Sequence, residues 1–339
     1  MGWRNPPVPW SELERRLSDA PLTPGYRAGS FPGDGGDAPA WSRTRKPYVA
    51  PDPTEVETAR NQGRVPYAEL HCHSNFSFLD GASHPEELVE EAARLGLEAL
   101  ALTDHNGFYG VVRFAEAARV WDLRTLYGAE LTLDGPEAEL GAADPGGRHL
   151  VVLARDPQGY AALSRTLSAA QMAGEKGAPR LSLDQVGHHV GDDGPGHLVA
   201  LTGCRKGTVP KALVDQGPAA ARREAQRLIE IFGRDGVRVE LWDHGDPLDS
   251  ARNDGLAQVA AAEGIEVVAT NNVHYATPRQ RPLATALAAV RARRSLDEMD
   301  GWLPGAAGAH LRSGDEQAHR FARYPGVVER AAELARDCA

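Results

Sequence analysis

The segment 70–81 contains side chains of the types that bind metal ions. His71 and His73 stand two positions apart, and Asp80 follows seven positions later. On a β-strand, residues i and i+2 point to the same face, so both imidazoles can reach one ion while Cys72 points away. Imidazole and carboxylate ligands favour zinc, with manganese or iron as alternatives. The segment therefore predicts one part of a metal site.

Side chains of the same types recur downstream, each directly after a short apolar run. They are His105, Glu130, Cys204 and His274. In a β/α barrel the chemistry lies where the strands end, so we expect these side chains to meet the first group at one rim. His149 does not follow this rule, because it begins its strand. A single buried histidine is usually a hydrogen-bonded core residue, but the whole set at strand ends favours a polynuclear metal site.

Clustered divalent ions would give this rim a defined chemistry. Two ions can hold both the attacking and the leaving oxygen of a phosphoester and supply hydroxide at neutral pH. A carboxylate that bridges two ions would make Glu130 the central ligand. Asp104 is interpreted as orienting His105 or another imidazole rather than as a ligand. We therefore predict a phosphoesterase site, with Glu130 and Asp104 as its candidate catalytic residues.

Other candidate groups have simpler explanations. His188 and His189 lie in a Gly- and Asp-rich stretch that we interpret as a surface loop. The basic residues Arg291, Arg293 and Arg294 stand at the end of a predicted helix. The helix dipole accounts for positive charge there without any bound phosphate.

The elements that must position these side chains alternate between strand and helix from Tyr67 onward. Apolar runs predict strands at 99–103, 125–127 continuing into 131–133, 149–154, 197–202, 237–241 and 266–270. Apolar stripes predict helices at 83–96, 111–120, 160–170, 219–232, 256–263 and 282–293. Ser83 and Glu86 would form the capping box of the first helix. Strand–helix repetition predicts a parallel sheet, and six or seven such units approach a closed (β/α) barrel.

The chain divides into three regions of different composition. Residues 1–65 are rich in Pro, Gly and charge, and we expect a mostly extended or disordered arm there. Residues 66–280 would form the metal-binding β/α barrel. Residues 281–339 begin with a helix that closes the barrel, continue through a Gly- and Ala-rich stretch, and end in a helix near 328–336. We expect this last region to open a further domain.

Composition excludes several classes of protein. The 339 residues carry a formal net charge of −10, which argues against a dedicated nucleic-acid-binding domain. Three cysteines, Cys72, Cys204 and Cys338, form no disulfide framework and indicate a reducing cytosol. The chain contains neither an apolar run of membrane-spanning length nor an amino-terminal signal peptide. We therefore expect a soluble, cytoplasmic protein with no membrane contact.

Six motifs together resemble the PHP (polymerase and histidinol phosphatase) domain. They match, in order, the type at the amino terminus of bacterial error-prone DNA polymerases, which belong to the DNA polymerase III alpha-subunit family. The motifs are His-Cys-His-Ser-Asn-Phe-Ser-Phe-Leu-Asp-Gly, Leu-Thr-Asp-His-Asn, Tyr-Gly-Ala-Glu, His-Leu, Leu-Thr-Gly-Cys and Ala-Thr-Asn-Asn-Val-His-Tyr. The resemblance runs from about Tyr67 to Tyr275, and more loosely to the end of the chain.

The resemblance implies a distorted (β/α)7 barrel, an α/β fold, that binds two to three divalent metal ions. By motif, the family's metal ligands correspond to His71, His73, Asp80, His105, Glu130, His149, Cys204, Asn272 and His274. Asn272 departs from the family, which has aspartate there. An amide oxygen can coordinate a metal but brings no negative charge, so we expect one metal position to be weaker and 3′–5′ exonuclease activity to be reduced.

The resemblance also implies a place in DNA replication and repair. The partners would be the remaining polymerase domains of a full-length homologue, DNA indirectly, and other proteins of replication or damage-tolerant translesion synthesis. The resemblance further implies that the chain is truncated before the polymerase core, so we expect no polymerase activity from it alone. Two alternatives stay open: a stand-alone metal-dependent phosphatase acting on a small phosphate monoester, as in the histidinol-phosphatase branch, and a catalytically inactive interaction module.

Overall fold

A computed structural model describes residues 65–135, 146–175, 177–193, 195–299, 302–303 and 308–338. All described residues belong to a single compact unit. The predicted amino-terminal arm lies outside the described residues except for Val65. None of the described helices is long and apolar enough to cross a membrane.

The core is one seven-stranded sheet in which the strands follow the order of the chain. The strands are β1 (Ala68–Glu69), β2 (Ala99–Leu102), β3 (Arg124–Leu133), β4 (Arg148–Ala154), β5 (Leu198–Leu201), β6 (Val237–Leu241) and β7 (Glu266–Ala269). Every residue of β2 and β5 is buried. Strands covered on both faces are continuously apolar, which explains the Ala- and Leu-rich runs seen in the sequence. The predicted pieces 125–127 and 131–133 are one continuous strand.

The prediction of an all-parallel sheet is wrong for one strand. Strands β1 to β3 and β5 to β7 pair in parallel, whereas β4 pairs antiparallel with both β3 and β5. The register of the β3–β4 pair runs from Leu133 opposite Arg148 to Gly128 opposite Leu153. A parallel return would need a crossover helix, and the segment 134–147 has no apolar stripe to form one. The start of β4 therefore lies at the rim where its antiparallel neighbours β3 and β5 end.

The two edges of the sheet meet just beyond β1 and β7. Cys72 and Val273 form a parallel bridge there. The backbone N–H of His73 donates to the carbonyl of Val273 at 2.8 Å, and the N–H of Val273 donates to the carbonyl of His71 at 2.8 Å. These bonds close the sheet into a distorted seven-stranded barrel. They also fix the backbone on both sides of the His71 and His73 side chains.

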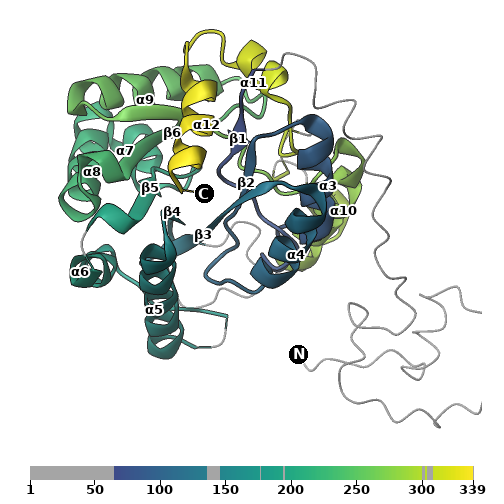
Figure 1. Ribbon diagram of the computed structural model, residues 1–339, viewed down its shortest axis with the longest axis horizontal. Helices are drawn as coiled ribbons and strands as arrows, with labels where there is room; N and C mark the ends of the chain where they lie inside the picture. Colours follow the sequence, from purple (N-terminus) through teal and green to yellow (C-terminus); the bar gives the residue numbers. More distant parts are fainter. Residues whose placement is uncertain are drawn as a thin grey trace, which may run out of the picture. The chain divides into compact units, whose positions relative to one another are not determined.

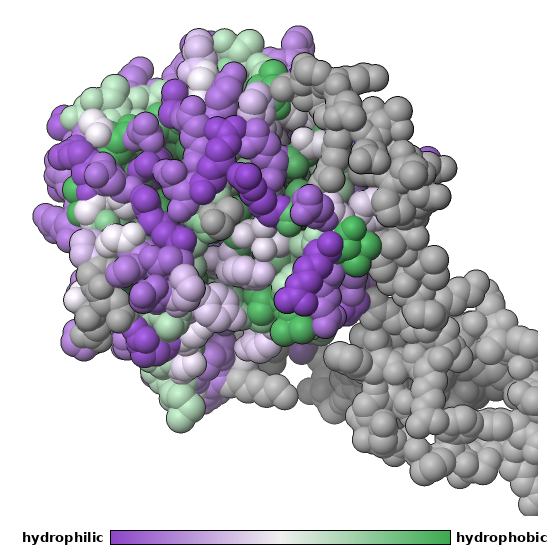
Figure 2. Space-filling view, viewed as in Figure 1, coloured by the Kyte–Doolittle hydropathy of each residue, from purple (hydrophilic) through white to green (hydrophobic). Residues whose placement is uncertain are grey.

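Helices surround the strands (Figure 1). They are α3 (Pro85–Leu95), α4 (Val111–Trp121), α5 (Pro157–Ala173), α6 (Leu183–Asp193), α7 (Thr208–Gln216), α8 (Pro218–Phe232), α9 (Asp249–Glu263), α10 (Arg281–Ala292), α11 (Gly314–Arg320) and α12 (Val327–Cys338). The sequence analysis missed α6, α7 and α11. Helix α12 packs against β7 and β1, across the place where the barrel closes. Hydrophilic residues dominate the face in Figure 2, and hydrophobic ones form small separate patches.

Two local expectations were wrong. His188 and His189 lie on helix α6 rather than in a loop, although His188 is exposed as expected. Helix α3 begins one residue later than predicted, because its capping box joins His84 to Glu87, whose Oε2 accepts from the His84 N–H at 2.7 Å. Ser83 instead accepts a hydrogen bond from the N–H of Ala276 at 2.8 Å. That bond ties the loop before α3 to the segment after β7.

Gly81 allows the loop 74–81 to fold back on itself. A Cβ atom at Gly81 would lie 1.9 Å from the carbonyl oxygen of Ser74, which is backbone and cannot yield. We expect Gly81→Ala to lower the free energy of unfolding by about 1–3 kcal/mol, as overpacking does. Gly191→Ala is the control, because nothing lies within 4 Å of its added Cβ. Urea unfolding of both variants measures this, and equal stabilities would contradict the prediction.

Candidate metal centre

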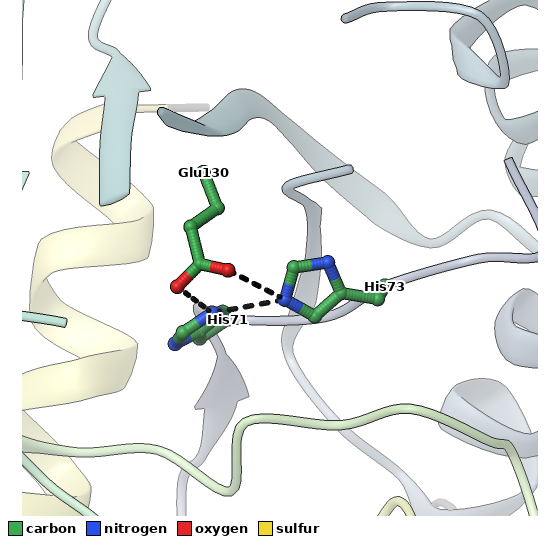
Figure 3. Close-up of side chains that lie close together, drawn as sticks. All are labelled: His71, His73 and Glu130. Atoms are coloured by element: carbon green, nitrogen blue, oxygen red, sulfur yellow. Dashed lines mark hydrogen bonds and ion pairs between the residues drawn. The ribbon is translucent and has the colours of Figure 1, made fainter. Parts of the chain in front are cut away.

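The first group of candidate ligands lies just past β1. His71 Nε2 and His73 Nε2 are 3.1 Å apart, and both side chains are fully buried. Glu130 on β3 faces them, with Oε1 3.4 Å from His71 Nε2 and Oε2 3.5 Å from His73 Nε2 (Figure 3). The strand register explains the convergence, since the bridge at Cys72 turns both imidazoles to one face. Three ligand atoms thus lie within reach of a single cation.

The second group shares Glu130 with the first. His105 Nδ1 lies 3.2 Å from Glu130 Oε2, and His149 Nδ1 lies 3.1 Å from Glu130 Oε1. Cys204 extends this group, with its Sγ 3.5 Å from His149 Nδ1 and 3.6 Å from Glu130 Oε1. The antiparallel direction of β4 explains His149, whose position seemed anomalous in the sequence. Because β4 starts at the functional rim, a residue at its beginning reaches the centre.

Asp80 brings two further imidazoles together. Its Oδ2 lies 3.0 Å from His105 Nε2 and 3.3 Å from His274 Nε2. Asn272 precedes His274 by two residues and has a left-handed backbone, with φ of 42°. Its Oδ1 is buried and has no hydrogen-bond partner among the residues that the structure describes. An orphaned buried carbonyl oxygen is costly unless a donor or a cation satisfies it.

Asp104 contacts the centre through a hydroxyl group rather than directly. Its Oδ1 accepts from the N–H of Ser74 and from Ser77 Oγ, both at 2.7 Å, and its Oδ2 accepts from Ser74 Oγ at 2.7 Å. Ser77 Oγ in turn lies 3.0 Å from His73 Nδ1. The contacts from Asp104 to Ser77 and from Ser77 to His73 therefore link this carboxylate to one imidazole.

Two buried carboxylates that the sequence analysis did not select support the same rim. Glu240 on β6 has Oε1 2.7 Å from His71 Nδ1 and accepts from Thr270 Oγ1 at 2.5 Å. Glu69 on β1 accepts from the N–H groups of His71 and Asn271, at 3.0 Å from each. Burial raises the pKa of Glu69 to about 7. The signal available in the sequence was an acidic residue near the end of an otherwise apolar strand.

The ionisable groups of the centre interact strongly with one another. Burial would lower the pKa of His71, but the carboxylates of Glu240 and Glu130 raise it to about 10, so a bound cation would have to displace a proton from this imidazole. Burial alone would raise the pKa of Glu130, but the imidazoles of His149, His105 and His71 lower it well below its usual range. Burial and the neighbouring His105 lower the pKa of His73, which stays neutral. Burial raises the pKa of the Cys204 thiol, so a bound cation would be needed to ionise it.

The donor set fits divalent cations. The Nδ1 atoms of His71 and His73 lie against Glu240 and Ser77, so their Nε2 atoms face inward. A metal-ligating histidine characteristically uses its second nitrogen in this way. Two ligand groups with a shared carboxylate also match a site in which one residue bridges two ions. The structure brings together eight of the candidate ligands predicted from the sequence: His71, His73, Asp80, His105, Glu130, His149, Cys204 and His274. Asn272 precedes His274 by two residues in the chain.

The sequence pattern of the PHP domain matches residues 69–244, and the chain belongs to the PHP domain family. It is 54% identical to an error-prone DNA polymerase of Mycolicibacterium paratuberculosis, over all of this chain and 30% of that protein. It is 49% identical to an error-prone DNA polymerase of Nocardia farcinica, over all of this chain and 32% of that protein. The chain thus spans about a third of the length of these relatives.

The fold is also similar to that of an inferred metal-dependent phosphoesterase from Bifidobacterium adolescentis. The two chains share 20% sequence identity, and the match covers 63% of this chain and 89% of the other with a TM-score of 0.41.

Glu240 offers a test of how the centre is supported. In Glu240→Gln the acceptor of the His71 Nδ1–H bond loses its charge, so we expect affinity for zinc to fall by roughly 10- to 100-fold. Glu266→Gln on β7 is the matched control, because its side chain is 59% exposed and pairs only with Arg238 among the described residues. Competition with a chromophoric chelator measures both affinities. Equal affinities in the two variants would exclude an orienting role for Glu240.

Proposed function

We propose that this PHP domain holds two to three divalent cations and hydrolyses phosphate esters. Zinc is the first candidate, with manganese or iron as alternatives. The ligands would be His71, His73, Asp80, His105, Glu130, His149, Cys204, Asn272 and His274. The observation that carries the proposal is the position of Glu130, whose two oxygens each face one imidazole of both groups.

Several residues of the chain would have distinct roles in this hydrolysis. Bound cations would supply hydroxide and offset the charge of a phosphoryl group. Glu130 keeps the two histidine groups at a fixed separation because it contacts both. Asp104 holds Ser77, and Ser77 holds the His73 ring in one orientation. His71, His73, Ser77, Asp104 and Glu130 are buried, so bulk water has little access to these groups.

We further propose that the domain serves an error-prone DNA polymerase in damage-tolerant synthesis in the cytoplasm. Support comes from relatives of that description that match the whole chain at 49–54% identity. The remaining polymerase domains of a full-length protein would be its direct partners. DNA would be contacted indirectly, and other replication or damage-tolerance proteins would be further partners. Residues 281–339 would lead towards the palm domain.

One observation favours a second candidate, a catalytically inactive metal-bound module. Asn272 stands where the family has aspartate, and an amide cannot balance the charge of two cations. In this case the metals would stabilise the loops of the rim, since binding to the folded state alone adds stability. In such a module, Glu69 and Glu240 would still hold the backbone and the ring of His71 through their buried hydrogen bonds.

Metal content is the first test. We expect purified protein to retain more than one equivalent of zinc or manganese, and His71→Ala with His73→Ala to lose most of it, because both groups of ligands lie around Glu130. His188→Ala is the control, since His188 is exposed on α6. Elemental analysis after dialysis measures all three proteins. Metal-free wild-type protein would contradict the proposal.

Asn272→Asp tests whether the amide limits activity. The added negative charge should strengthen one metal position and raise hydrolysis of a generic phosphodiester or of single-stranded DNA by roughly tenfold, which corresponds to about 1.4 kcal/mol of barrier. Aspartate tolerates the left-handed backbone at this position nearly as well as asparagine does. Steady-state rates at saturating metal are the measurement. An unchanged rate in a folded, fully metallated variant would favour the structural module.

A further inference from the structure

Arg291, in the last turn of α10, reaches the candidate metal centre from outside the segment that matches the family pattern. Its Nη1 lies 2.5 Å from Asp80 Oδ1. Asp80 directs its other oxygen, Oδ2, to His105 and His274. The Asp80 carboxylate therefore links the guanidinium group of Arg291 to two candidate metal ligands, His105 and His274.

The basic residues at the end of α10 are not equivalent, although the sequence analysis treated them alike. Arg293 and Arg294 are exposed, and Arg294 lies over the ring of Trp302 at 5.7 Å. The Arg291 side chain is only 28% exposed. The dipole of the helix explains positive charge near its end, but it does not explain why one of three arginines turns inward.

The end of α10 is packed on both sides of Arg291, whose guanidinium keeps hydrogen-bond donors that the described residues do not use. Ala289 and Ala292, on either side of it, pack with Met299 in a small hydrophobic cluster. The Nε atom of Arg291 is buried and has no hydrogen-bond partner within the described part of the chain. A guanidinium carries five N–H donors in a planar fork, so the contact with Asp80 does not exhaust it. The unused donors would suit a second oxyanion at the same rim.

Positive charge also stands at the other end of the centre. The loop that follows Cys204 carries Arg205 and Lys206, and the carbonyl of Lys206 accepts from the N–H of His149 at 2.9 Å. Contacts thus run from Arg291 through the candidate ligands to this basic loop. These basic residues border a centre that would itself hold divalent cations, and together they would favour an anionic substrate at this place.

We propose that Arg291 binds the phosphate group of the substrate beside the metal ions. This proposal rests on the phosphoesterase function proposed above and adds a substrate-binding residue to it. A planar guanidinium binds two phosphate oxygens at once, which a lysine cannot do. With cations held by the candidate ligands, the donors of Arg291 that Asp80 does not use would bind the phosphoryl oxygens.

The test is the affinity of metal-loaded protein for inorganic phosphate, measured by titration calorimetry. We expect Arg291→Gln to weaken phosphate binding by about 10- to 100-fold, the loss expected for charge-assisted hydrogen bonds. Its metal content should equal that of the wild type or exceed it, because a cation that competes for Asp80 has been removed. Arg291→Lys keeps the charge but not the planar fork, so its affinity for phosphate should lie between those of the wild type and Arg291→Gln. Arg293→Gln is the matched control on the same helix end.

The alternative is that Arg291 only holds Asp80 in place. Arg291→Gln and Arg291→Lys would then lose metal, and molecules that remain fully metallated would bind phosphate as tightly as the wild type. That result, or a metal-loaded wild type that binds no phosphate, would overturn the proposal. A wild type that binds phosphate through Arg291 but hydrolyses no ester would contradict the phosphoesterase function alone. If the enzyme is active, Arg291→Gln should raise KM more than it lowers kcat.

Discussion

One buried carboxylate organises the centre of this molecule. The two oxygens of Glu130 lie 3.1–3.5 Å from nitrogens of His71, His73, His105 and His149. An isolated carboxylate in a protein interior is strongly disfavoured, so its burial is tolerated only where opposite charge or a cation meets it. The segments that follow β1 and β2 and the strand β4 must therefore converge on this residue of β3 for the barrel to be stable. The fold and the chemistry of the rim thus depend on the same contact.

The backbone around the centre is held in conformations that side chains adopt rarely. Leu79, Asn106 and Asn272 have φ values of 60°, 51° and 42°. Each is itself a candidate ligand or stands next to one, Asp80 or His105. Conformations of this kind cost energy and persist only where the surroundings enforce them. Here the surroundings are the barrel closure beyond β1 and β7 and the folded-back loop 74–81. Part of the backbone strain thus lies where ligand atoms must be aimed, while Asp122, Asp134 and Arg293 carry positive φ elsewhere.

A layer of buried polar groups links this rim to the barrel wall. Glu240 fixes His71 from behind, Ser77 fixes His73, and Glu69 holds the backbone on both sides of the closure. Such networks are favourable only when most of their members are paired. The arrangement is preorganised, because the nitrogens that face inward are set by hydrogen bonds on the far side of each ring. That feature is compatible both with catalysis and with a metal-bound structural module. The neutral amide of Asn272, in place of a carboxylate, is what favours the structural module.

Sequence alone determined the alternation of strands and helices, the strand ends, and the residue types gathered there. Those features are local, since apolar runs, caps and His-x-His spacing depend on near neighbours in the chain. The direction of β4 was not available in this way, because strand pairing depends on which segments meet, and an apolar run reads the same in both directions. Tertiary structure therefore decided how His149 reaches the centre, which buried acids support it, and which of the arginines of α10 turns towards Asp80.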